Sequence, residues 1–213
     1  GCSIGARPVD LHLMALEKMG AKIEIKEGYI TAICKTLKGA EIEFPMVSVG
    51  ATENTMMAAT LASGTTVLRN AAKEPEIVDL AQFLNTLGAK VSGAGTDTIE
   101  IEGVTRLTAG QHTVVGDRIE AGTYLLAAAI TGGDVTGTGI SEKHMGTVLD
   151  KMRATGCIIS TTENSISLNA PKALEAVNIV TEPFPGFATD MQAQFMAAMT
   201  IAKGRSEFTE TIF

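Results

Sequence analysis

Apolar residues recur along the chain at two spacings, one typical of amphipathic helices and the other of strands. Glycine and proline mark the ends of these segments, because glycine commonly follows a helix and proline suits its first turn. Helices are predicted on this basis at residues 8–19, 50–62 and 74–87 and from residue 189 onward. Strands are predicted at residues 40–44, 66–70, 90–92, 98–102 and 206–213. The face of the first helix that we expect to be buried carries Val9, His12, Leu13 and Leu16.

The same pattern returns along the chain. Three similar segments end in glycine followed by a small residue, and their glycines lie at positions 20, 88 and 156, in equal steps of 68 residues. Gly64 and Gly132, which close alanine-rich segments, have the same spacing. A period of this length is too long for common solenoid repeats and holds a whole α/β unit. We therefore predict repeated βαβαββ-type units in two domains, residues 1–115 and 116–213, incomplete at both ends and with some apolar faces uncovered.

The amino-acid composition of the chain argues against several classes of function. A chain of 213 residues that is 45% hydrophobic can bury a core, and its net charge of -7 without a Lys/Arg block argues against a nucleic-acid-binding surface. The longest apolar runs are shorter than a membrane span. The three cysteines are too scattered for a disulfide framework or a zinc site, so a reducing cytoplasm is expected, with Cys34 and Cys157 as core residues. The histidines have no metal-binding spacing either.

A candidate reactive site lies within the first eleven residues. Cys2 is in a glycine-flanked segment, and Arg7 precedes Pro8, which suits the first position of a helix. The backbone N–H groups of such a helix start and the Arg7 guanidinium would bind phosphate, and their field would favour the Cys2 thiolate. The alternative is structural: Cys2 is a small buried residue, and Arg7-Pro8 only begins a helix.

Two further helix starts carry polar groups. Ser48 and Gly50 lie where a strand leads into a helix and offer a hydroxyl and N–H groups to a phosphate, although Ser48 would equally serve as a helix cap. Asp190 is placed to accept a proton from a hydroxyl, as a general base does. Structurally, Thr189 and Gln192 would form a capping box, and Asp190 would complement the helix dipole. Three residues share one position in successive units, 14 residues before a helix-ending glycine: Gly50, Arg118 and Asp190.

Five blocks in one order, which together span the chain, resemble the enolpyruvyl transferase family, in its branch that uses UDP-N-acetylglucosamine. The blocks are residues 1–12, 47–52, 73–77, 117–123 and 189–195. The resemblance implies a two-domain inside-out α/β barrel with the substrates between the domains and no cofactor. It also implies transfer of the enolpyruvyl group from phosphoenolpyruvate to the 3′-hydroxyl of UDP-N-acetylglucosamine, the first committed step of peptidoglycan synthesis.

The resemblance also implies residue roles. Cys2 matches the cysteine that acts on phosphoenolpyruvate and is alkylated by fosfomycin, and Asp190 matches the carboxylate that takes the proton of the sugar hydroxyl. The substrate-binding positions that it implies are Arg7, Pro8, Val9, Asp10, Leu11, Val47, Ser48, Val49, Gly50 and Ile212. Met46 stands where some members have Lys. Family Lys and Arg residues from both ends have no counterpart here, so an internal fragment that is inactive alone is expected.

Two other functions were weighed. A sister enzyme that uses 3-phosphoshikimate shares the fold, but its usual Gly-Asn-Ala-Gly-Thr loop does not occur in this sequence. The alternative from another class is a non-catalytic α/β module that binds an anionic nucleotide or a partner protein through faces left open by truncation.

Overall fold

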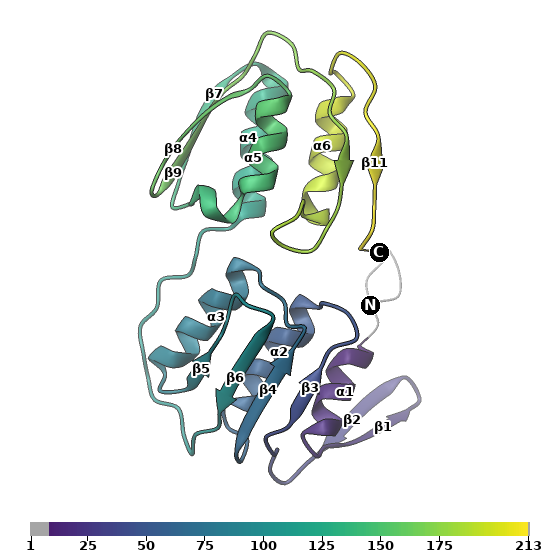
Figure 1. Ribbon diagram of the computed structural model, residues 1–213, viewed down its shortest axis with the longest axis vertical. Helices are drawn as coiled ribbons and strands as arrows, with labels where there is room; N and C mark the ends of the chain where they lie inside the picture. The colour runs from purple at the N-terminus through teal and green to yellow at the C-terminus, as the bar shows by residue number, and fades with distance from the viewer. Residues whose placement is uncertain (1–8, 213) are drawn as a thin grey trace. The chain divides into compact units, whose positions relative to one another are not determined.

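The computed structural model describes residues 9–212, and the chain forms two compact units that divide between Thr113 and Val114 (Figure 1). Each unit has its own hydrophobic core. Within the described residues no helix is long and apolar enough to cross a membrane, and no three His, Cys, Asp or Glu side chains are grouped to hold a metal ion.

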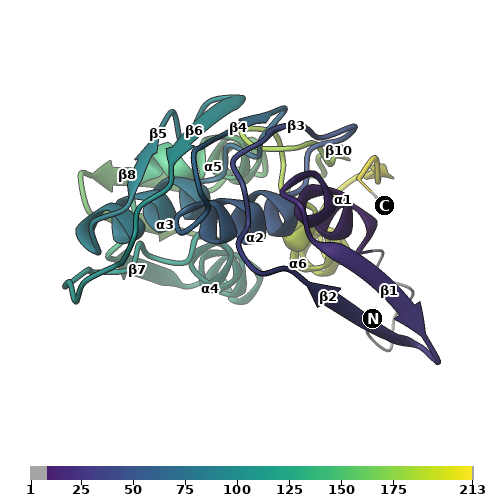
Figure 2. The same cartoon turned by 90° about the horizontal axis from the view of Figure 1, so that it is seen from below.

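The first unit is a four-stranded sheet covered by helices on one face, with a hairpin beside it (Figures 1 and 2). Its helices are α1 (Asp10–Lys18), α2 (Val49–Ala59) and α3 (Pro75–Thr86). Its strands are β1 (Lys22–Lys26), β2 (Tyr29–Ile33), β3 (Glu41–Glu43), β4 (Thr65–Arg69), β5 (Lys90–Ser92) and β6 (Thr98–Glu102). The sheet order is β3-β4-β6-β5, with β3 parallel to β4 and the other pairs antiparallel. Alternate residues of β4 and β6 are buried, as expected for a sheet with one covered face.

Glycines follow the ends of several helices, as the repeat predicts. Gly20, Gly88 and Gly156 have φ values of 96°, 91° and 96°, a left-handed conformation that costs glycine no Cβ clash. Gly132 ends a helix of the second unit in the same region, with φ of 70°. The predicted helix end at Gly64 is wrong, because α2 ends at Ala59 and Gly64, with φ of 95°, lies directly before β4. The equal spacing in sequence therefore corresponds to an equal backbone turn in each unit.

The hairpin β1–β2 projects from the rest of the first unit (Figure 2). Ile25 and Ile30 face each other across it, yet they are 68% and 45% exposed. Cys34 follows β2 and is also exposed, so its predicted place in the core is wrong. Apolar residues alternate along β2, a pattern typical of a strand with one buried face. Among the described residues, however, no element covers this face.

The first helix buries a face different from the predicted one. Ala15 and Met19 are fully buried, and Leu11 and Met14 pack against the same core. Val9 is exposed, and the predicted Leu13 and Leu16 are only partly buried. The face is set by α2 and β3, against which α1 packs, and these neighbours are distant in sequence.

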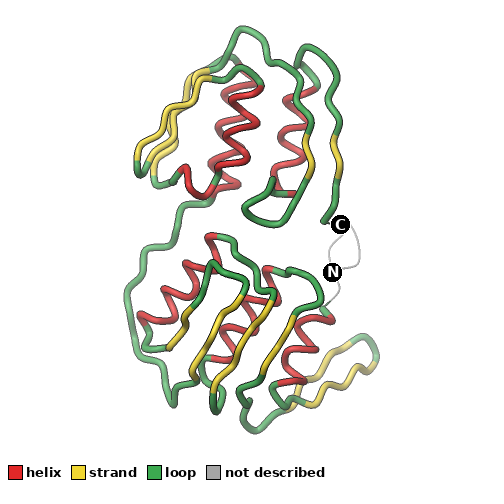
Figure 3. The backbone as a smooth tube through the Cα atoms, in the orientation of Figure 1, coloured by secondary structure: helices red, strands yellow, loops and turns green. Residues whose placement is uncertain are grey.

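The second unit has a three-stranded sheet, a helical layer and a short parallel strand pair (Figure 3). Its helices are α4 (Arg118–Thr131), α5 (Gly146–Ala154) and α6 (Gln192–Met199), with short 3₁₀ turns η1 (Glu142–His144) and η2 (Thr189–Met191). Its strands are β7 (Asp134–Thr138), β8 (Ile158–Thr162), β9 (Ser165–Asn169), β10 (Ile179–Val180) and β11 (Phe208–Thr209). The sheet order is β7-β9-β8, all antiparallel.

The core of the second unit lies between this sheet and the helices. Phe187 and Phe195 meet edge to face with ring centroids 5.1 Å apart. Cys157 is buried, as predicted, and burial raises the pKa of its thiol. Gly122 of α4 lies so close to Met191 that a Cβ there would come within 2.7 Å of the Met191 side chain. This close approach packs α4 against η2, next to Asp190.

Candidate functional site

Three of the predicted site residues, Cys2, Arg7 and Pro8, fall within residues 1–8 and lie outside the described part of the chain. Their roles stay predictions. The other predicted residues fall into two groups, one at the starts of α1 and α2 and the other around η2 and Ile212.

The start of α1 carries the first group. Val9 precedes the helix and is 40% exposed, and Asp10 is exposed in the first turn. Leu11 packs against the core and so anchors the helix. Residues 9–11 therefore begin a helix at the surface, and the contact of Leu11 with the core fixes this helix start in place.

The start of α2 carries the second of these segments. Ser48 is the cap of this helix, and its Oγ accepts from the Ala51 N–H at 3.3 Å, so the predicted capping role is confirmed. Thr52 Oγ1 donates to the Ser48 carbonyl at 2.8 Å. The first turn has no acidic side chain to oppose a bound anion. Val47 packs against the core, while Met46 and Val49 are exposed.

A contact between His12 and Asn54 joins α1 to α2. Asn54 Nδ2 lies 3.1 Å from His12 Nδ1. The imidazole also lies against Gly50, where a Cβ would be 3.5 Å from His12 Cε1. The structure thus brings the segment that starts α1 together with the segment that starts α2, two blocks that are about 40 residues apart in the sequence.

Carboxylates gather farther along α2. Burial raises the pKa of Glu53, and the negative charges of Glu76 and Glu74 raise it further. Glu74 is itself buried, and its Oε2 has no hydrogen-bond partner among the described residues. Negative charge is therefore disfavoured around Glu53, one turn after the start of α2.

Asp190 lies in η2, directly before α6, and its side chain is exposed. It makes no hydrogen bond or ion pair within the part of the chain that the structure describes. The predicted capping box is wrong, because Thr189 Oγ1 donates to Glu210 Oε2 at 2.6 Å and the start of α6 has no side-chain cap. The Thr189 hydroxyl thus serves as a donor to Glu210 and not as an acceptor for the N–H groups of the helix start.

Glu210 organises this second group. Its carboxylate accepts from Thr181 Oγ1 at 2.8 Å and from the Ile212 N–H at 2.6 Å, besides Thr189. It therefore fixes the segment of Asp190 and the segment of Ile212 to one acceptor. Glu210 was not among the predicted site residues, because nothing in the local spacing marks a residue whose partners are distant in the sequence.

The turn before α4 is a third helix start. Asp117 Oδ1 accepts from the backbone N–H groups of Ile119 and Glu120, so it caps α4. The Arg118 guanidinium lies 5.5 Å from the centre of the Phe184 ring, a cation–π distance. Gly50, Arg118 and Asp190 thus all lie at or next to a helix start. This agrees with their shared position, 14 residues before a glycine in each unit.

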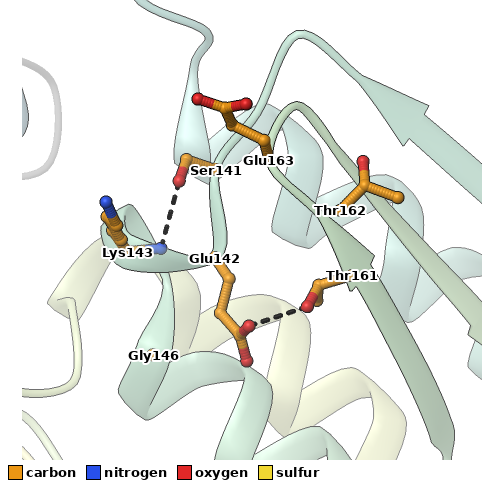
Figure 4. Close-up of a pocket in the computed structure, with 7 residues that line it drawn as sticks. All are labelled: Ser141, Glu142, Lys143, Gly146, Thr161, Thr162 and Glu163. Atoms are coloured by element: carbon orange, nitrogen blue, oxygen red, sulfur yellow. Dashed lines mark hydrogen bonds between the residues drawn. The ribbon is translucent and has the colours of Figure 1, made fainter.

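A polar pocket of about 670 Å³ lies beside η1 and contains none of the predicted site residues (Figure 4). The Glu142 carboxylate accepts from Arg153 and from Thr161, both at 2.7 Å. These hydrogen bonds lower the pKa of Glu142. The Glu142 carboxylate therefore links η1 to α5 and β8 through hydrogen bonds, and we interpret its role as structural.

The chain is similar to known proteins in both sequence and structure. The protein-family model described as EPSP synthase (3-phosphoshikimate 1-carboxyvinyltransferase) matches residues 1–213. A relative from Actinobacillus pleuropneumoniae serotype 7 (strain AP76), named UDP-N-acetylglucosamine 1-carboxyvinyltransferase, is 57% identical over 100% of this chain and 51% of its own length. One of the same name from Haemophilus ducreyi is 56% identical over 100% and 50%. The chain spans about half the length of the curated relatives it matches.

Solved structures match across the chain at low sequence identity. The enolpyruvyl transferase NikO from Streptomyces tendae has a TM-score of 0.82 at 19% identity and covers 96% of this chain and 52% of its own. An EPSP synthase from Acinetobacter baumannii has a TM-score of 0.64 at 22% identity, over 98% and 49%. At these identities the likeness concerns the fold, and it confirms the predicted α/β fold of the enolpyruvyl transferase type.

Proposed function

The chain belongs to the EPSP synthase family, and from that premise we propose that it is part of a UDP-N-acetylglucosamine 1-carboxyvinyltransferase. The whole protein would transfer the enolpyruvyl group of phosphoenolpyruvate to the 3′-hydroxyl of UDP-N-acetylglucosamine and release phosphate. The observation that carries the proposal is the 57% identity over the whole chain to a relative of that name. A cytoplasmic place in peptidoglycan synthesis follows from these substrates.

The chemistry requires one base and one acid. The hydroxyl oxygen forms a bond to the substituted enol carbon of phosphoenolpyruvate while a base removes its proton, and an acid delivers a proton to the methylene carbon. Phosphate then leaves as the methyl group loses a proton and the double bond forms again. We assign the base to Asp190, which is exposed and has no partner among the described residues. We assign the acid to Cys2, the cysteine at which fosfomycin would attach.

The nucleotide needs donors for its diphosphate. We assign these to residues 7–11 and 47–50, because the starts of α1 and α2 lie together and the first turn of α2 lacks acidic side chains. Residues 1–115 would then form the domain that binds the nucleotide sugar, and residues 116–213 the domain that carries the general base Asp190. Met46 offers no positive charge to this segment.

The role of Asp190 is tested by Asp190→Asn in the full-length protein. The substitution removes the base but no contact among the described residues, so turnover is expected to fall by roughly 10²-fold or more while the melting temperature stays unchanged. Phosphate release and thermal unfolding are measured together, with Glu163→Gln in an exposed turn as the control. Retained turnover with a lower melting temperature would show that Asp190 is structural.

A further inference from the structure

The contact between α1 and α2 determines which ring nitrogen of His12 carries a proton. Asn54 Nδ2 lies 3.1 Å from His12 Nδ1. An amide nitrogen has hydrogens to donate and does not accept, so Nδ1 is the acceptor and is unprotonated. The neutral imidazole then carries its hydrogen on Nε2.

The Nε2 edge of this ring lies at the start of α2. A Cβ at Gly50 would be 3.6 Å from Nε2 and 3.5 Å from Cε1, so the ring edge rests on the bare backbone of the first helical turn. That turn follows the Ser48 cap and has no acidic side chain. The Nε2–H group is therefore a neutral donor beside the first turn of α2, and the start of a helix favours an anion.

We propose that His12 donates its Nε2–H to a diphosphate oxygen of the nucleotide sugar, and that Asn54 is a positioning residue that holds His12 in the tautomer able to do so. The inference rests on the proposed function, since that supplies the diphosphate. It also explains how the segment obtains a side-chain donor besides Ser48, because Met46 and the valines around it have none.

The tautomer is tested by long-range ¹H–¹⁵N correlation spectroscopy of the 213-residue chain at a pH where its imidazoles are neutral. The chain has 3 histidines, so comparison with His12→Gln assigns the signals. We expect an unprotonated Nδ1 and a protonated Nε2 in His12. Asn54→Asp presents only acceptors and is expected to move the proton to Nδ1, whereas Asn164→Asp adds the same charge in an exposed turn and should not. A protonated Nδ1 in the unaltered chain would overturn the inference.

The donor role is tested by calorimetric titration with UDP-N-acetylglucosamine. We expect His12→Phe to weaken binding about tenfold, as for the loss of a hydrogen bond to a charged group. His12→Gln keeps an N–H donor at similar reach and should bind within about threefold of the unaltered chain. The variant Asn54→Leu removes the hydrogen bond to His12 Nδ1 without adding a charge. It should bind UDP-N-acetylglucosamine more weakly than Asn164→Asp, which adds a charge but keeps that hydrogen bond.

The outcomes separate this inference from the proposed function. Unchanged affinity in His12→Phe and Asn54→Leu, with clear binding by the unaltered chain, would overturn the inference and leave the proposed function intact. If the unaltered chain binds no UDP-N-acetylglucosamine although its tautomer is as expected, the donor role is overturned, whereas the proposed function is decided separately by phosphate release from the full-length protein. Circular dichroism of each variant shows whether a loss of binding reflects a loss of folding.

Discussion

Single side chains determine where the first unit tolerates negative charge. The pKa of Glu53 is raised by burial and by the nearby Glu76 and Glu74. A carboxyl group with a higher pKa in the folded than in the unfolded state holds its proton longer when folded. Stability therefore falls as the pH rises from the unfolded to the folded pKa of Glu53, and the loss is complete above the folded pKa.

Glu53→Gln removes this charge and is expected to raise the unfolding midpoint at pH 7. The gain should vanish below about pH 4, near the ordinary pKa of glutamate, because the wild-type group is then protonated in both states. Urea unfolding between about pH 3 and pH 8 measures the difference, with the exposed Glu17→Gln of α1 as the control. A lower midpoint for Glu53→Gln at pH 7 would mean that the carboxylate is paired favourably.

Residue roles were predictable where the partner is close in sequence. Ser48 as a helix cap follows from its place three residues before the N–H that it accepts. Glu210 was not predictable, because Thr189 and Thr181 lie 21 and 29 residues away from it. The exposure of Cys34 was missed for a similar reason, since alternation in a strand indicates a face but does not show what covers it.

Elements were predicted more completely than contacts between them. The bounds of β5 and β6 are those predicted, and α1, α3, α4 and α5 are followed within two residues by a glycine with positive φ. These features depend on propensity and on glycine's conformational freedom, which are local. The buried face of α1 differs from the prediction because α2 and β3 determine it. The pairing of β10 with β11 likewise joins segments about 30 residues apart.

At the scale of elements, Glu210 links the end of β10, the start of η2 and the segment after β11. Glu210→Gln keeps the shape but removes the charge and one acceptor oxygen, which is expected to cost about 1 to 3 kcal/mol of stability in the second unit. The Ile212 amide should then exchange its hydrogen faster. Hydrogen exchange and urea unfolding measure both effects, with the exposed Glu207→Gln as the control. Unchanged protection of Ile212 would show that its hydrogen bond to Glu210 is not important for stability.

At the scale of the whole molecule, the chain holds two cores and spans about half the length of its curated relatives. We expect it to fold, because each unit buries its own apolar residues. We do not expect it to catalyse the proposed reaction alone, because it matches only about half the length of the related proteins. Losing one preorganised electrostatic contact typically costs about 10²- to 10³-fold in rate.

The most direct test of the account is the acceptor specificity of phosphate release from phosphoenolpyruvate by the full-length protein. The account predicts release that depends on UDP-N-acetylglucosamine and does not occur with 3-phosphoshikimate, and a rate for the 213-residue chain at least 10²-fold lower. Release with 3-phosphoshikimate alone, or turnover by the 213-residue chain within about tenfold of the full-length protein, would contradict it.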